Sequence, residues 1–150
     1  MSNNNYENYL SVKKGFFSWF YTLDHKRIGI LYLFTVLIFF LIGGLFAILI
    51  RIILWNNFCS DSLIFAKYYN RLFTAHGLVM LFVALIPGIP SSLGNFILPL
   101  QIGTRDLIFP KLNLYSYYCF LIGILISVYC IFFGSIDTGW TLYAPYSITS

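Results

Sequence analysis

Three long stretches without a charged residue constrain this chain more than any other feature of its sequence. They cover residues 28–50, 72–104 and 112–136. Each exceeds the roughly 20 residues that a helix needs to span the hydrocarbon core of a bilayer. Lipid offers the backbone no hydrogen bonds, so a spanning segment must be a helix or part of a closed barrel. The sequence therefore predicts an all-α integral membrane protein with three transmembrane helices.

The charges are few and unevenly placed. Only 9% of the 150 residues are charged, against roughly 25% in a soluble domain. Six basic residues fall on the side of the amino terminus and three on the other side, which by the positive-inside rule places the amino terminus in the cytoplasm. The two groups are Lys13, Lys14, Lys26, Arg27, Arg105 and Lys111, and Arg51, Lys67 and Arg71. The net charge of +4 then follows from topology, and we expect no nucleic-acid partner.

The middle stretch is too long for one straight crossing, since 33 residues at about 1.5 Å each would extend about 50 Å. We expect the helix to weaken after Pro87 and Pro90, and Pro99 and Gly103 to lead into a loop. The predicted helices cover about 28–54, 70–97 and 112–136. The first 27 residues are predicted to form a cytoplasmic tail.

His76 is the main ionisable group at membrane depth, about one turn inside the outer end of the second predicted helix. Such a residue is functional by default. The imidazole could ligate a metal or haem, carry protons or simply hydrogen-bond another helix. Ala75 and Gly77 flank it with little bulk, which would leave room for a flat macrocycle.

Geometry restricts the partners of His76 within this chain. The other histidine, His25, precedes the first predicted helix, roughly 30 Å away across the hydrocarbon. The two histidines therefore cannot share one metal. Met80 lies on the same helix face about 6 Å along the axis, so it cannot be the opposite axial ligand of a haem.

Four strings, in order along the chain, together resemble subunit I of the haem-copper respiratory oxidases, of the cytochrome c oxidase type. They are DHKRIG from Asp24, YNRLFTAHGLVM from Tyr69, GNFILPLQIGTRDLIFPKLN from Gly94 and DTGWTLYAPYS from Asp137. The last resembles bacterial members in particular. The resemblance extends from residue 16 to nearly the end of the chain.

The resemblance implies a haem site near the outer face. His76 matches the first axial ligand of the low-spin haem, and Arg51 matches an arginine that hydrogen-bonds a peripheral substituent of that haem. Trp140 matches a tryptophan near the propionates, and Tyr69 a tyrosine close to the same haem. Without the resemblance, Arg51 could equally be a snorkelling arginine, and the two aromatic residues members of the interfacial belt.

The resemblance also implies a proton-channel entrance near the inner face. Asp106 matches the aspartate at the mouth of a proton-uptake channel, and Asn95 and Asn113 match asparagines that line it. Without the resemblance, Asp106 beside Arg105 would be a solvated surface pair, and the asparagines turn or cap residues.

The family's subunit I is several times longer, with about twelve helices, and its later helices hold the second haem a ligand, the high-spin haem ligand and the copper ligands. We therefore expect residues 28–150 to be the first three helices of that domain, truncated, binding low-spin haem a only in part. The implied partners are the rest of subunit I, a copper-bearing subunit II, subunit III, cytochrome c and the bilayer of a bacterial cell membrane. A quinol oxidase, or a non-catalytic three-helix remnant, remains the alternative.

Overall fold

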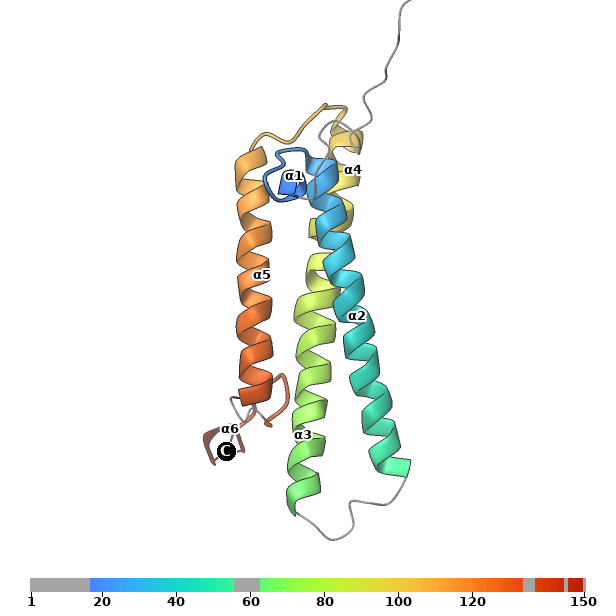
Figure 1. Ribbon diagram of the computed structural model, residues 1–150, viewed down its shortest axis with the longest axis vertical. Helices are drawn as coiled ribbons and strands as arrows, with labels where there is room; N and C mark the ends of the chain where they lie inside the picture. The colour runs from blue at the N-terminus through green and yellow to red at the C-terminus, as the bar shows by residue number, and fades with distance from the viewer. Residues whose placement is uncertain (1–16, 56–62, 134–136, 145, 150) are drawn as a thin grey trace, which may run out of the picture.

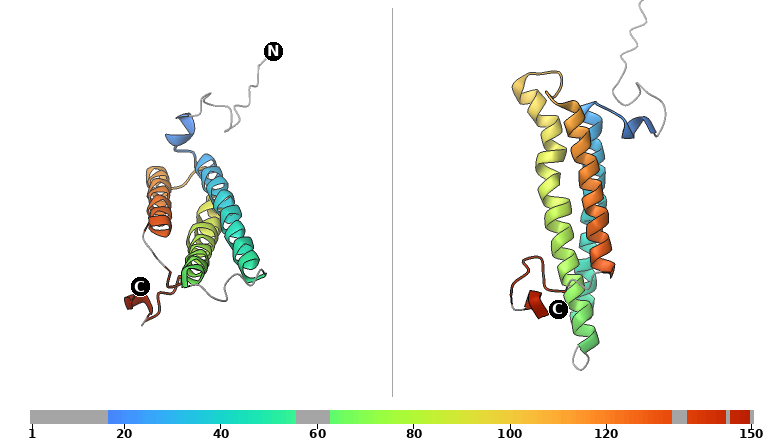
Figure 2. Two further views of the ribbon diagram at one scale, coloured as in Figure 1. Left: turned by 60° about the horizontal axis from the view of Figure 1, so that its bottom comes forward. Right: turned by 90° about the vertical axis from the view of Figure 1, so that its left-hand side faces the viewer.

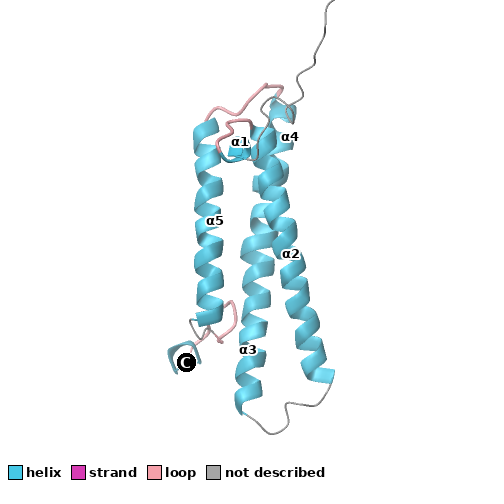
Figure 3. Cartoon of the chain, viewed as in Figure 1, coloured by secondary structure: helices cyan, strands magenta, loops and turns pink. Residues whose placement is uncertain are grey.

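A computed structural model describes residues 17–55, 63–133, 137–144 and 146–149 of the chain. Within these ranges, three helices are long and apolar enough to cross a membrane: His25–Trp55, Ala66–Ile102 and Pro110–Phe133. They run side by side as an elongated bundle (Figure 1), and the described segments between them are loops (Figure 3). This confirms the prediction of an all-α membrane protein with three crossings.

The helices follow the chain in the order α1 to α6. Their bounds are α1 Phe17–Phe20, α2 His25–Trp55, α3 Leu63–Leu78, α4 Gly94–Ile102, α5 Pro110–Phe133 and α6 Tyr146–Thr149. The predicted first and third helices agree with α2 and α5 at the ends that the structure describes. Residues 1–16 of the predicted tail and residues 134–136 of the third predicted helix lie outside the described residues.

The second crossing is one continuous helix rather than a helix that gives way to a loop near residue 97. Two π-helical segments, Val79–Leu85 and Gly88–Leu93, join α3 to α4. At their ends the backbone N–H groups of Ile86 and Gly94 donate to carbonyls five residues earlier, and this wider winding accommodates the missing N–H of nearby prolines. The helix ends where Gly103 adopts a φ of 72°. The predicted end near 97 was therefore about five residues too early.

The second crossing packs closely on α2 at two glycines of α2. A Cβ at Gly29 would lie 2.8 Å from Phe96 Cε2, and a Cβ at Gly43 would lie 2.7 Å from Met80 Sδ. Ser92 is fully buried and its hydroxyl donates to the carbonyl of Gly29 at 3.3 Å. Small residues that let helix backbones approach are typical of membrane bundles.

Helix α5 contacts α2 through a separate layer. Ile28 and Tyr32 of α2 and Tyr117 of α5 form a buried apolar cluster, and the rings of Tyr32 and Tyr117 meet edge to face with centroids 5.0 Å apart. Figure 2 shows α5 (orange) alongside the other two long helices. Near the same end, Tyr118 of α5 donates a hydrogen bond to the carbonyl of Phe20 in α1.

Candidate functional site

His76 is half-buried where α3 faces α2. Its Nδ1 lies 2.9 Å from the carbonyl oxygen of Gly43. A carbonyl only accepts, so the imidazole carries its proton on Nδ1 and donates it to this oxygen. In the neutral ring, Nε2 then keeps its lone pair for a metal or a proton.

The space beside His76 is filled by protein at Gly77. A Cβ at Gly77 would lie 3.0 Å from Trp140 Cδ1, and the Trp140 ring meets Phe82 edge to face with centroids 6.2 Å apart. The sequence suggested that Gly77 left room for a macrocycle. In the structure its small size admits Trp140 instead.

The loop that carries Trp140 is attached to α3 by its backbone. The N–H of Gly139 donates to the hydroxyl of Thr74 at 2.9 Å, and that hydroxyl donates to the carbonyl of Asn70 at 2.8 Å. Gly139 has a φ of 82°, a conformation that disfavours a side chain. Glycine at this position therefore lets the loop turn and brings Trp140 against Gly77, the residue after His76.

Tyr69 and Arg51, the other two predicted haem residues, lie elsewhere on these helices. Tyr69 stacks on Phe73 of the same helix, with centroids 6.4 Å apart. Arg51 is exposed and lines a groove on α2 together with Ala47 and Trp55. The structure thus brings Trp140 against Gly77, next to His76 in the sequence, and leaves Arg51 on an open helix face.

His76 also lies farther from the start of its helix than the sequence predicted. Helix α3 begins at Leu63, so His76 is about 20 Å along the helix rather than one turn from its end. Met80 packs on Gly43, whose carbonyl accepts from His76, so the two side chains do share a face as predicted.

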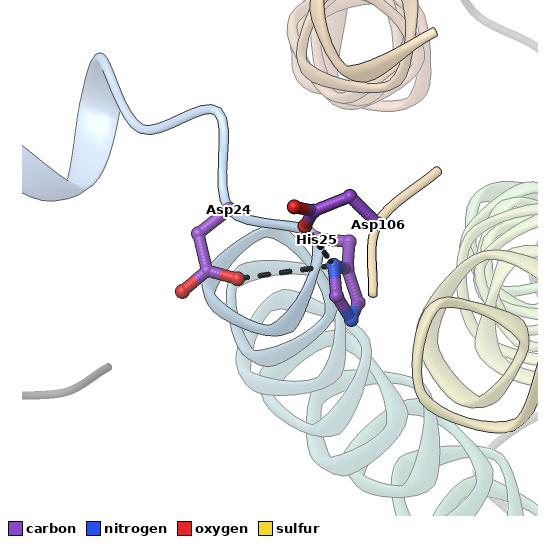
Figure 4. A group of neighbouring side chains, drawn as sticks. All are labelled: Asp24, His25 and Asp106. Carbon is purple, nitrogen blue, oxygen red and sulfur yellow. Dashed lines mark hydrogen bonds and ion pairs between the residues drawn. The ribbon is translucent and has the colours of Figure 1, made fainter. Parts of the chain in front are cut away.

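Asp106, the predicted mouth of a proton channel, pairs with His25. The two side chains lie 3.0 Å apart between Nδ1 and Oδ1, with His25 buried and Asp106 largely exposed. Asp24 approaches the same Nδ1 at 3.9 Å. Figure 4 shows both carboxylates turned toward the ring, Asp24 and His25 from the start of α2 and Asp106 from the loop after α4. Asp106 is therefore paired across 81 residues of sequence and is not simply a solvated partner of Arg105.

The ring nitrogen and the two carboxylate oxygens lie within 4.8 Å of one another. These are donor atoms of the kind that bind a divalent cation. The 3.0 Å contact of His25 with Asp106 already accounts for the arrangement as a hydrogen bond.

Asn95 and Asn113 face each other between α4 and α5. Asn113 Nδ2 donates to Asn95 Oδ1 at 2.6 Å, and Asn95 Nδ2 donates to the carbonyl of Ser91 at 2.5 Å. The pair lines a cavity of about 250 Å³. A neighbouring cavity of about 460 Å³ is lined by Asp106. Both cavities are lined by Leu98, Leu107, Asn113 and Ser116, so Asp106 and the two asparagines line two adjacent cavities.

Sequence reasoning missed His25 and four hydroxyl groups beside the asparagines. Tyr32 and Thr35 of α2 hydrogen-bond Ser116 and Tyr117 of α5. The sequence did contain a signal for the hydroxyl groups. Tyr32 and Thr35 are three residues apart in an apolar helix, and Ser116 and Tyr117 follow Asn113 by three and four residues. For His25, the signal was the position beside Asp24 at the start of a helix.

The two polar regions occupy opposite parts of the bundle. His25 begins α2 and Gly43, the partner of His76, follows 18 residues later, which is about 27 Å along the helix. The prediction that the two histidines cannot share a metal is confirmed by this spacing.

A family model described as cytochrome C and quinol oxidase polypeptide I matches residues 27–150. The chain is 43% identical over 145 residues to a heme-copper oxidase subunit I+III of Aeropyrum pernix, covering 91% of this chain and 17% of that protein. It is 39% identical over 149 residues to a probable cytochrome c oxidase subunit 1-alpha of Streptomyces avermitilis, covering 95% and 25%. It is 41% identical over 128 residues to a probable quinol oxidase subunit 1 of Staphylococcus aureus, covering 85% and 19%.

The chain thus spans a quarter or less of the length of these relatives.

Proposed function

The chain belongs to the family of haem-copper oxidase subunit I, and on this premise we propose that it supplies one ligand of a low-spin haem and a proton entrance to a terminal respiratory oxidase. The parent enzyme would pass electrons from cytochrome c to oxygen, reduce it to water and translocate protons. The relatives contain at least three times as much further sequence, so oxygen reduction belongs to the whole enzyme.

The hydrogen bond from His76 Nδ1 to Gly43 carries the haem proposal. Ligating histidines almost always donate their second ring N–H to a carbonyl or carboxylate, which fixes the ring and raises its basicity. His76 has this arrangement, with Nε2 left as the available ligand atom. His76 therefore fits as one ligand of a haem iron, and a further ligand would come from another part of the enzyme.

A low-spin haem bound at this position would accept an electron and pass it on. Around it, His76 would hold the iron and Trp140, packed on Gly77, would close one side of the site. We assign Arg51 and Tyr69 to the periphery of the haem by their match to the family, with Arg51 available because its side chain is exposed.

The proton entrance rests on Asp106, Asn95 and Asn113. The exposed carboxylate of Asp106 can take a proton from solvent, and His25 holds it in position by donating from Nδ1. The cavity beyond it is bordered by the two asparagines, whose amide and carbonyl groups can orient water. Hydrogen-bonded water in this region would carry protons inward.

Quinol is the second candidate for the electron donor, since a relative described as a quinol oxidase is 41% identical to this chain. Assays of the assembled oxidase with reduced cytochrome c and with a quinol decide between the donors. We place the enzyme in a bacterial cell membrane with the amino terminus in the cytoplasm, together with the copper-bearing subunit II and subunit III.

His76→Ala in the assembled oxidase tests the haem proposal. We expect loss of the low-spin haem absorption and of oxygen consumption, because Ala offers no ligand to the iron. The matched control is Met80→Leu. Met80 lies on the same helix face as His76 and packs on Gly43, but it has no ring nitrogen. Low-spin absorption that persists in His76→Ala would refute the assignment.

A further inference from the structure

Two hydrogen bonds fasten α5 to α2 beside the proposed proton entrance. Tyr32 OH lies 2.9 Å from Ser116 Oγ, and Thr35 Oγ1 lies 3.1 Å from Tyr117 OH. Thr35 and Tyr117 are both buried, at 8% and 5% exposure. In a membrane, such interhelical bonds between apolar helices fix their relative position.

The direction of the bond between Thr35 and Tyr117 follows from its neighbours. Thr35 donates its one hydroxyl proton to the carbonyl of Leu31 at 2.8 Å. Its oxygen is then the acceptor, and Tyr117 is the donor. Each hydroxyl in the pair thus has a defined role, and neither can be replaced by a methyl group without losing the interhelical bond.

Neither Thr35 nor Tyr117 lines the cavities beside Asp106 and Asn95. Tyr117 directly follows Ser116, which lines both cavities, and Thr35 contacts Tyr117 from α2. Any influence that they have on proton uptake must therefore pass through the placement of α5.

The placement of α5 determines whether the two asparagines meet. Asn95 belongs to α4, which packs closely on α2 where Phe96 meets Gly29. Asn113 belongs to α5, which is attached to α2 at Tyr117. The 2.6 Å bond from Asn113 to Asn95 links α5 to α4, and the pair Thr35 and Tyr117, together with the bond of Tyr32 with Ser116, links α5 to α2.

We propose that Thr35 and Tyr117 are a positioning pair that holds α5 at the separation from α2 at which Asn113 meets Asn95. This inference rests on the proposed proton entrance. The pair carries no proton itself; it sets the spacing of the groups that line the two cavities.

Tyr117→Phe and Thr35→Val in the assembled oxidase test the inference, since each removes one hydroxyl and keeps the side-chain size. We expect each to slow the proton-uptake phase by about threefold to tenfold, the range that corresponds to one interhelical hydrogen bond. The double variant should be no slower than either single one, because both break the same bond. Thr35→Ser, which keeps the hydroxyl, should show the proton-uptake rate of the parent enzyme.

Ser127→Ala is the matched control on α5, because its hydroxyl donates only within the helix, to Gly123 at 2.8 Å. It should leave proton uptake unchanged. The low-spin haem absorption and the electron transfer into that haem are measured on every variant and should match the parent enzyme. If Tyr117→Phe and Thr35→Val lower haem content and uptake together, the pair is a general folding contact and the inference is wrong.

Asp106→Asn in the same preparation separates the two proposals. If Asp106→Asn slows uptake while Tyr117→Phe and Thr35→Val behave as the parent enzyme, the positioning role fails and the proton entrance stands. If Asp106→Asn leaves uptake unchanged, the proposed entrance itself fails, and the inference with it.

Discussion

At the scale of single residues, both polar regions depend on a histidine with its Nδ1 directed to an oxygen. His76 donates to a backbone carbonyl and His25 to a carboxylate. A carbonyl is neutral and fixes a ring that can act as a ligand. A carboxylate carries charge, and it fits a group that exchanges protons with solvent.

Asp106→Asn should slow proton uptake by about a hundredfold, the usual contribution of one positioned acid or base group. Asparagine keeps an oxygen for His25 and loses the titratable proton. Flow-flash measurement of proton uptake by the assembled oxidase checks this expectation. Asp24→Asn is the control, since Asp24 approaches the same ring nitrogen only at 3.9 Å and is absent from the lining of the cavity at Asp106; it should remain close to the parent rate.

At the scale of helices, contacts at glycine determine how α2 packs on its neighbour. Gly29 and Gly43 face Phe96 and Met80 at distances that leave no room for a Cβ. Gly44, next to the second of these, has no heavy atom within 4 Å of a Cβ. A side chain is therefore sterically disfavoured at Gly43 and has open space at Gly44, the next residue of the same helix.

Gly29→Ala should destabilise the protein by about 1–3 kcal/mol through overpacking against Phe96 and Asn95. Gly44→Ala should be neutral or stabilise it by about 0.5–1 kcal/mol, because alanine loses less backbone entropy in a helix. Equilibrium unfolding in detergent measures both. Equal effects of the two substitutions would contradict the close packing at Gly29.

The helices themselves were predictable, and the long-range contacts were not. Length and apolar composition suffice for three crossings, and the face shared by His76 and Met80 follows from helical periodicity. The helix end at Ile102 was missed because Pro99, which local rules treat as a helix breaker and which was expected to lead into a loop, lies inside α4. The contact of His25 with Asp106 spans 81 residues and depends on how α2 and α4 pack, which one sequence does not encode locally.

At the scale of the whole bundle, the haem region and the proton region are joined through α2 and through the second crossing, which carries His76 in α3 and Asn95 in α4. Gly77, beside His76, and Asn113, beside Asn95, belong to different regions. Helix α2 contacts the first region at Gly43 and the second at Gly29, and these two glycines are about 21 Å apart along the helix. Substitutions in one region should leave the packing of the other intact.

Gly77→Ala and Asn113→Ala should therefore have additive effects on the free energy of unfolding, within about 0.5 kcal/mol. Gly77→Ala forces a Cβ to within 3.0 Å of Trp140, and Asn113→Ala removes the bond to Asn95. Unfolding of both single variants and the double variant in detergent gives the comparison. A coupling above about 1 kcal/mol would show that the regions share a packing unit.

Helix α2 contacts both polar regions of the bundle. The same helix holds the ring of His76 at Gly43 and ends about 27 Å away at His25, the partner of Asp106. A tilt of about 3° around Gly43 would move His25 by about 1.4 Å, the size of the helix shifts that operate switches in other proteins. The close packing of Gly29 on Phe96, which lies between these two points of α2, opposes such a tilt. A slight change in the angle of the imidazole is therefore not passed on to His25.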